Sequence, residues 1–190
     1  MKAKGNVKRV GKVNFWRGRE HRIPVEIKEV VLQQYYSIDA LYVYCDSSCR
    51  TEGSKEMAVA CTYVTNGSVI VKQYSFYPPY DCIGKNIYGE LKAIMFGIKH
   101  FQKHMGKNVK NVVIYSDVNN IEQLISKEVI FRKNETLSKL QSELISLYEA
   151  KKKEYCQITI SIQYLSTHQK KHNPFMKASH NACYTLLKRK

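Results

Sequence analysis

Two apolar runs, each ending in an aspartate, dominate the pattern of hydrophobic and polar positions in this chain. Residues 40–46 end in Asp46 and residues 111–117 end in Asp117, and both runs are rich in the β-branched and aromatic residues that favour strands. Taken alone, each aspartate is typical of a turn that closes a strand. An amphipathic helix with Glu90 in its first turn lies between the runs. Three carboxylates on these elements can converge on one metal site.

Two further strands are predicted over residues 57–64 and 68–77. Asn66-Gly67 lies between them, and Asn-Gly is a strong hairpin signal because both residues tolerate a positive φ. The first three strands are therefore expected to form an antiparallel meander.

Apolar residues at helical spacing predict helices over residues 87–105, 119–126, 135–152 and 175–187. Alternating residues predict a fifth strand over 156–164, and a loop rich in His and Lys follows it. Residues 40–190 thus have the pattern of one α/β domain.

Residues 1–39 are predicted to be a basic N-terminal extension. Residues 1–28 hold nine Lys or Arg and two Glu, interleaved with Phe15 and Trp16. Basic and aromatic residues together suit contact with phosphates and stacking on bases. The alternative is an arm that packs Trp16 on the domain. Residues 23–27 are expected to form a short extended piece.

The charge balance favours a polyanionic partner. The chain has 31 Lys+Arg against 16 Asp+Glu, a formal net charge of +15, and no carboxylate after Glu154. Nucleic acid is the partner that such a balance suits best. The alternative is a basic protein that uses its charge for solubility.

Hydropathy and cysteine usage limit the setting in which the protein acts. No apolar run approaches the roughly 18 residues that a membrane span needs. We expect a cytoplasmic monomer with no membrane association and no small-molecule cofactor. The six cysteines form no C-x-x-C pair and are expected to be reduced and mostly buried.

The order of elements and carboxylates resembles the ribonuclease H family, type 1. The matching stretches are Tyr44-Cys-Asp46-Ser-Ser-Cys49, Asn86-Ile-Tyr-Gly-Glu90 and Tyr115-Ser-Asp117. Each is short, but their joint order on strand, helix and strand is a specific signal. The resemblance implies an RNase H-like five-stranded mixed sheet, in the order 3-2-1-4-5, flanked by α-helices.

The resemblance also implies a metal-dependent endoribonuclease that hydrolyses the RNA strand of RNA–DNA hybrids. Such a site holds two ions, Mg²⁺ or Mn²⁺, on hard oxygen ligands. Asp46 is expected to be shared by both ions, with Glu90 and Asp117 completing their ligands. Asn86 matches a family asparagine that touches the hybrid, and Ser47 and Ser48 beside the first aspartate are assigned to the same surface.

The chain departs from the family at the fourth metal ligand. The family places an aspartate near the start of the last helix, whereas the best match here is His180 in Ser-His-Asn-Ala-Cys. Because a neutral imidazole adds no negative charge, the second ion is expected to bind less tightly. Asn181 is the next candidate for this position.

Four other histidines carry open alternatives. His168, and after it His172, matches the family's mobile histidine, which is thought to help activate water or release product; the alternative is a solvated basic loop. His168, His172, His180 and Cys183 could instead bind zinc together. His100 and His104 also have zinc-ligand spacing, but a surface pair is the more typical outcome.

Two functional alternatives accompany the hybrid-specific nuclease. One is a non-catalytic RNase H-like module that binds nucleic acid, with its metal site degraded at residue 180. The other is a nuclease for structured RNA.

Overall fold

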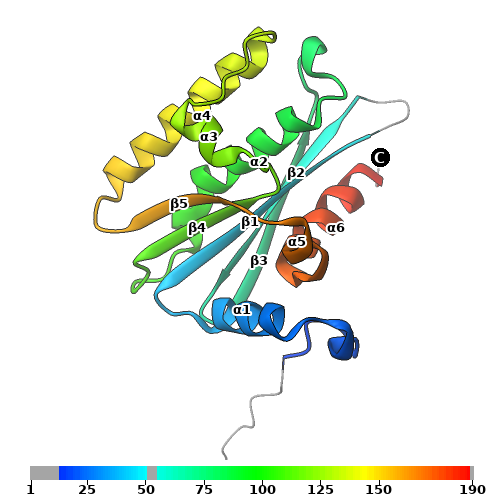
Figure 1. The fold of residues 1–190 in the computed structure, drawn as a ribbon, viewed down its shortest axis with the longest axis vertical. Helices are drawn as coiled ribbons and strands as arrows, with labels where there is room; N and C mark the ends of the chain where they lie inside the picture. The colour runs from blue at the N-terminus through cyan, green and yellow to red at the C-terminus, as the bar shows by residue number, and fades with distance from the viewer. Residues whose placement is uncertain (1–12, 51–54, 189–190) are drawn as a thin grey trace, which may run out of the picture.

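The protein, in a computed structural model that describes residues 13–50 and 55–188, is built around one five-stranded mixed sheet (Figure 1). The sheet order is β3-β2-β1-β4-β5, which confirms the predicted topology. The strands are β1 (Ala40–Cys49), β2 (Met57–Thr65), β3 (Ser68–Phe76), β4 (Asn111–Ser116) and β5 (Thr159–Tyr164).

Helices cover both faces of this sheet. They are α1 (Val25–Tyr36), α2 (Asn86–His100), α3 (Ile121–Ser126), α4 (Glu135–Glu154), α5 (Thr167–His172) and α6 (Pro174–Lys188), with short 3₁₀ segments at Glu20–Arg22, Tyr80–Cys82 and Phe101–His104. The largest core cluster lies between the sheet and α2, α3 and α4, while α1 and α6 pack on the opposite face. No helix within the described ranges is both long and apolar enough to cross a bilayer.

The hairpin between β2 and β3 forms as predicted. Asn66 and Gly67 have φ angles of 46° and 73°, the left-handed values that a tight turn of this kind requires. β2 is buried along nearly its whole length, as expected of a strand with neighbours on both edges.

The central strand β1 does not end at Asp46, contrary to the prediction. It continues to Cys49 because β2 keeps pairing with it, from Tyr42 opposite Val64 to Cys49 opposite Met57. Its parallel pairing with β4 stops at Tyr44 opposite Tyr115. Asp46 therefore lies just beyond the last residue of β1 that pairs with β4. At this point β4 does not pair with β1 beside the Asp46 carboxylate.

The N-terminal part of the described chain is helical where an extended piece was expected. Pro24 has φ −53° and directly precedes α1, in keeping with the preference of proline for helix starts. Ile27 and Val31, one turn apart, are buried on the second face of the sheet. The indole of Trp16 donates to the carbonyl of His172 at 2.9 Å, so this aromatic packs on the domain. Residues 1–12 lie outside the described ranges.

Buried hydrogen bonds fix α6 against β1. Asn173 begins this helix by accepting from the backbone N–H groups of Phe175 and Met176 at 2.9 and 3.1 Å, and its amide donates to the Tyr44 hydroxyl at 3.1 Å. Further along, the Ser179 hydroxyl donates to the Tyr44 carbonyl at 2.8 Å. The next residue on α6 is His180, so these bonds set its distance from β1.

The six cysteines are free, as predicted. Four are buried, and Cys49 and Cys156 are half-buried and exposed. Cys45 and Cys61 face each other across β1 and β2, with 3.4 Å between their sulfurs.

Candidate active site

Three elements bring the predicted carboxylates together. Asp46 comes from β1, Glu90 from the first turns of α2, and Asp117 directly follows β4. One carboxylate oxygen from each lies within 4.8 Å of the others. Asp46 is only 2% exposed, so its charge is largely removed from water. The structure therefore assembles the acidic cluster that the sequence predicts.

A glycine allows α2 to approach β1 at this point. A Cβ at Gly89 would lie 2.6 Å from the Ser47 hydroxyl oxygen, closer than real Cβ contacts allow. The Ser47 hydroxyl donates to Glu90 Oε1 at 2.7 Å, which orients the carboxylate. Glu90 Oε2 is buried without a hydrogen-bond partner. An acceptor of this kind suits a cation that the protein itself does not supply.

The acidic cluster carries a high electrostatic cost. Burial raises the pKa of Asp46, an effect that nearby Lys170 and His180 reduce and Asp117 reinforces. Burial, and then the charges of Asp117 and Asp46, raise the pKa of Glu90 well above its ordinary value. Like charges in a space of low polarity disfavour ionisation. A divalent cation would relieve this cost directly.

Two nitrogen-bearing side chains border the cluster from α5 and α6. The Lys170 ammonium forms an ion pair with Asp117 Oδ2 and lies 3.8 Å from Asp46 Oδ1. Burial acts to lower the pKa of Lys170, but the hydrogen bond to Asp117 and the carboxylate charges outweigh it and raise that pKa. His180 Nδ1 lies 3.0 Å from Asp46 Oδ2. The protein thus places cationic or polarisable groups against two of the three carboxylates.

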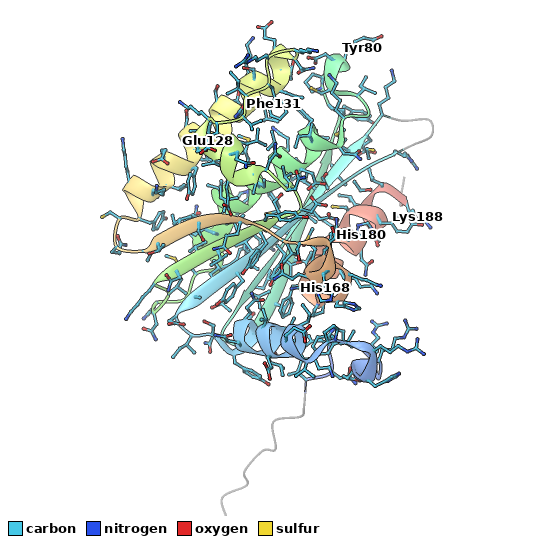
Figure 2. The ribbon with its side chains drawn as sticks, in the orientation of Figure 1. Tyr80, Glu128, Phe131, His168, His180 and Lys188 are labelled. Carbon is cyan, nitrogen blue, oxygen red and sulfur yellow. The ribbon has the colours of Figure 1, made fainter. Side chains whose placement is uncertain are left out.

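The predicted histidines take different positions. His180 lies beside the cluster, at the position where the resemblance places the fourth ligand. His168 is exposed on α5 (Figure 2). The His168 ring packs against the His172 ring, with centroids 5.8 Å apart. From the same segment it is Lys170 that reaches the carboxylates.

Sequence reasoning missed Lys170 because it treated this segment as a loop. Ser166 and Gln169 form a capping box that starts a short helix, α5. A Ser-x-x-Gln pattern is a recognisable helix start, and a helix points Lys170 and Lys171 in different directions. The pattern could therefore have predicted the helix, but not which lysine meets the carboxylates.

The residues assigned to hybrid contact lie next to the cluster. Asn86 is exposed at the start of α2, and its side-chain oxygen accepts from the Cys49 thiol at 3.4 Å. Ser48 is half-buried on β1, opposite Ala58. Asn181 faces a different cavity, described below.

Neither zinc alternative forms. The Cys183 thiol donates to the Asp46 carbonyl at 3.4 Å, while His168 and His172 contact each other on α5. His100 and His104 pack against Phe96 and Tyr63. Within the described ranges, the acidic trio is the one group of three or more His, Cys, Asp or Glu that converges closely enough to hold an ion.

These residues fit divalent cations with a preference for oxygen. Three carboxylates supply hard ligands, and the partnerless Glu90 Oε2 points to a missing positive charge. Asp46, Glu90 and Asp117 are the residues that would hold such ions, with His180 at the edge of the group.

Comparisons with known proteins agree with this geometry. The model of the RNase H family matches residues 39–182, about three quarters of the chain. A search of curated proteins found no match.

Several solved structures share the fold. RNase H1 from the halophilic archaeon Halobacterium salinarum has a TM-score of 0.56 at 10% identity, over 80% of this chain and 99% of that chain. LC11-RNase H1, isolated from compost by a metagenomic approach, has 0.55 at 14% identity, over 79% and 99%. LC11-RNase H1 in complex with an RNA/DNA hybrid has 0.52 at 13% identity, over 77% and 99%. At these identities the likeness shows the fold alone.

The raised pKa of Glu90 predicts a pH-dependent stability of the metal-free protein. A carboxyl group whose pKa is higher in the folded state than in the unfolded state makes its full contribution to stability at a pH below the unfolded-state pKa. This contribution is lost as the pH rises through the folded-state pKa. Relative to Glu90→Gln, the wild type should therefore lose stability above the ordinary value of 4.5, by up to about 1.4 kcal/mol per pH unit. Urea denaturation in a chelator from pH 4 to 9 measures the difference. A difference that does not change with pH would contradict the prediction.

Lys170 should compete with metal ions for the carboxylates. Lys170→Met should lower the stability of the metal-free protein and tighten Mn²⁺ binding by roughly ten-fold, about 1.4 kcal/mol. Calorimetric titration with Mn²⁺ and the ion-dependent rise in melting temperature measure the effect. Lys171→Met, one residue away with the same loss of charge, is the matched control. Equal Mn²⁺ affinity in all three proteins would show that Lys170 does not oppose the ions.

Proposed function

The chain belongs to the RNase H family, and we propose that its acidic cluster hydrolyses the RNA strand of RNA–DNA hybrids. The observation that carries the proposal is the convergence of Asp46, Glu90 and Asp117, from β1, α2 and the end of β4, within 4.8 Å. Hydrolysis of a phosphodiester needs groups that stabilise both the incoming and the leaving oxygen, and clustered carboxylates hold the ions that do so.

The proposed cofactors are two Mg²⁺ or Mn²⁺ ions, which would supply Lewis-acid stabilisation of the reacting oxygens. Asp46, the most buried of the three carboxylates, would be the ligand common to both ions, and Glu90 and Asp117 would complete the ligands. His180 replaces the carboxylate of the usual family site, so this set holds one negative charge fewer. We infer that one of the two ions binds weakly.

Residues around the cluster prepare it for this chemistry. Ser47 orients Glu90 through its hydrogen bond, and the Asn173 and Ser179 contacts hold α6 so that His180 stays beside Asp46. Lys170 neutralises charge on Asp117 and Asp46, and bound ions would compete with it for these carboxylates. His168 is exposed on the same short helix and remains our candidate for exchanging protons with bulk water.

The proposed substrate follows from charge and from the surface around the cluster. A net charge of +15 favours a polyanion. Asn86, Ser47 and Ser48 lie at the start of α2 and the end of β1, where they can meet the minor groove and its 2′-hydroxyl groups.

One observation favours the non-catalytic alternative. The Lys170–Asp117 ion pair occupies an oxygen that the proposed chemistry needs, and no fourth carboxylate is available after Glu154. If Lys170 cannot be displaced, the protein would bind hybrids without cleaving them.

A substrate panel separates the hybrid nuclease from both alternatives. An RNA–DNA hybrid, an RNA duplex, a structured RNA and single strands of the same sequence are incubated with protein, with and without Mg²⁺ or Mn²⁺. We expect ion-dependent cleavage of the RNA strand in the hybrid. Binding without cleavage would establish the module, and preferential cleavage of RNA alone would establish the structured-RNA nuclease.

Asp46→Asn should reduce hybrid cleavage by at least a thousand-fold while leaving the fold intact. The variant removes the most buried carboxylate of the cluster, and because the pKa of Asp46 is raised, its ionised form is a net cost to the folded protein. Stability should therefore hold or rise, as thermal denaturation will show. Cleavage at the wild-type rate would exclude Asp46 as a catalytic residue.

The wild type should work better with Mn²⁺ than with Mg²⁺, and His180→Asp should shift the preference back towards Mg²⁺. Mn²⁺ accepts nitrogen ligands more readily, whereas Mg²⁺ prefers near-ideal octahedral oxygen geometry. Cleavage rates measured against metal concentration test this for both proteins. If the wild type already saturates at low Mg²⁺ and His180→Asp changes nothing, residue 180 is not a ligand.

A further inference from the structure

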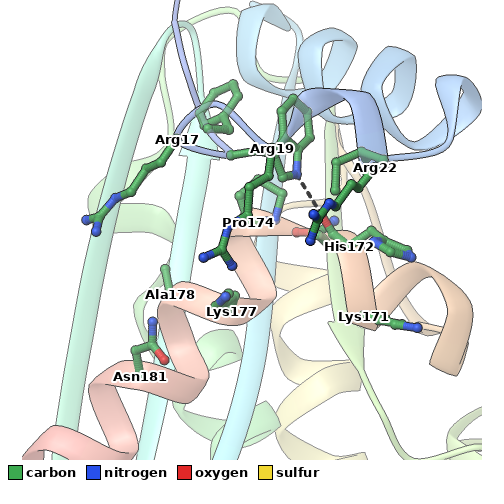
Figure 3. A pocket seen from close by; sticks show the side chains of 13 residues that line it. Arg17, Arg19, Arg22, Lys171, His172, Pro174, Lys177, Ala178 and Asn181 are labelled. Carbon is green, nitrogen blue, oxygen red and sulfur yellow. Dashed lines mark hydrogen bonds between the residues drawn. The ribbon is translucent and has the colours of Figure 1, made fainter.

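A basic site lies beside the acidic candidate active site. Residues 15–23, here called the N-terminal segment, pack against α5 and α6. A cavity of about 620 Å³ lies between this segment and the two helices (Figure 3). Five of its lining residues are Arg or Lys, and none is Asp or Glu: Arg17, Arg19, Arg22, Lys171 and Lys177. The acidic cluster does not line this cavity, so it is a separate site.

The positive charges in this cavity are not balanced by acidic side chains of the described residues. Across the described ranges, none of the five forms an ion pair with a carboxylate. Five like charges gathered on one surface repel one another unless an anion joins them. The guanidinium groups of three arginines also suit the paired oxygens of phosphate.

The fold positions these arginines through a fixed anchor. The Trp16 indole donates to the His172 carbonyl at 2.9 Å, and the Arg19 backbone N–H donates to the Trp16 carbonyl at 3.1 Å. Arg17 has a φ of 49°, a left-handed conformation that is unfavourable for a residue with a side chain. Arg19 and Arg22 extend from this turn towards Pro174 and His172 at the start of α6, whereas Arg17 extends in another direction (Figure 3).

The cavity and the acidic cluster share two helices. On α5, Lys170 contacts the carboxylates while the adjacent Lys171 lines the cavity. On α6, His180 contacts Asp46 while the adjacent Asn181 lines the cavity. Consecutive Cα atoms are about 3.8 Å apart. Neighbouring residues of the same two helices therefore contact the acidic cluster and line the basic cavity, so a strand of nucleic acid at the carboxylates can extend along these helices towards the cavity.

We propose that this cavity binds backbone phosphates of the nucleic-acid strand whose scissile phosphate lies at the acidic cluster. The inference rests on the proposed function and adds a subsite built by the N-terminal segment. Its cations are exposed and spread over three elements, an arrangement that suits a polyanionic chain better than one small anion.

Salt-dependent binding tests the subsite. Hybrid affinity is measured in chelator, where no ion-dependent cleavage occurs, for the wild type and for Arg19→Ala/Lys177→Ala. Each lost phosphate contact should reduce the slope of log affinity against log salt by about 0.9, so the double variant should lose about 1.8. The control Lys107→Ala/Lys110→Ala removes the same charge at the start of β4, the opposite end of that strand from Asp117. Equal slopes for both variants would overturn the proposal.

Trp16 provides a local readout because it is the chain's one tryptophan. Its indole N–H resonance should shift on addition of hybrid, and the shift should be lost in Arg19→Ala/Lys177→Ala, with thermal denaturation confirming that the variant folds. Inorganic phosphate should produce a similar shift only at much higher concentration. The absence of a shift with hybrid would overturn the proposal, and so would a shift that needs no lower concentration of hybrid than of inorganic phosphate.

The two proposals can fail separately. If the hybrid is never cleaved but the Trp16 shift and the slope change occur, the subsite stands and the proposed catalysis falls. If the wild type cleaves the hybrid and the double variant binds as tightly, with the same slope, the subsite falls and the catalytic proposal stands.

Discussion

The burial of three converging carboxylates is the constraint on which the rest of this structure depends. Asp46, Glu90 and Asp117 converge within 4.8 Å, and burial raises the pKa of the first two. Such a cluster persists only if the fold holds it in place and positive charge compensates it. The central strand supplies the first condition, because β1 continues along β2 after β4 has left it. Lys170 and His180 supply part of the second.

The helices that compensate the cluster are tied to the rest of the domain by buried polar contacts. Tyr44 donates to Gln34 on α1, accepts from Asn173 at the start of α6, and stacks on Tyr115 of β4 with ring centroids 5.0 Å apart. Burial raises the pKa of the Tyr44 hydroxyl, so it stays neutral and keeps donating. These contacts thus join α1, β1, β4 and α6 in one network. Helix α1 therefore helps to support the site.

Much of this arrangement could be predicted from sequence, because its signals are local. The strands, the Asn66-Gly67 hairpin and the order of the three carboxylates follow from periodicity and turn chemistry. The continuation of β1 to Cys49 depends on its pairing with β2. The polar residues after Asp46 are typical of a turn, so the local sequence does not predict this continuation. Helix α1 was hidden by Pro24 and by β-branched residues, although Ile27, Val31 and Gln34 have helical spacing. The position of Lys170 depends on tertiary packing that no local pattern encodes.

The most direct test of the account follows the oxygen that attacks the phosphate. An RNA–DNA hybrid is cleaved in heavy-oxygen water with Mg²⁺ or Mn²⁺, and the ends of the RNA fragments are analysed by mass spectrometry. If ions held by the carboxylates activate water, the fragments should carry 3′-hydroxyl and 5′-phosphate ends, with the heavy oxygen in the phosphate. Fragments ending in 2′,3′-cyclic phosphate, or cleavage that persists in chelator, would contradict the account.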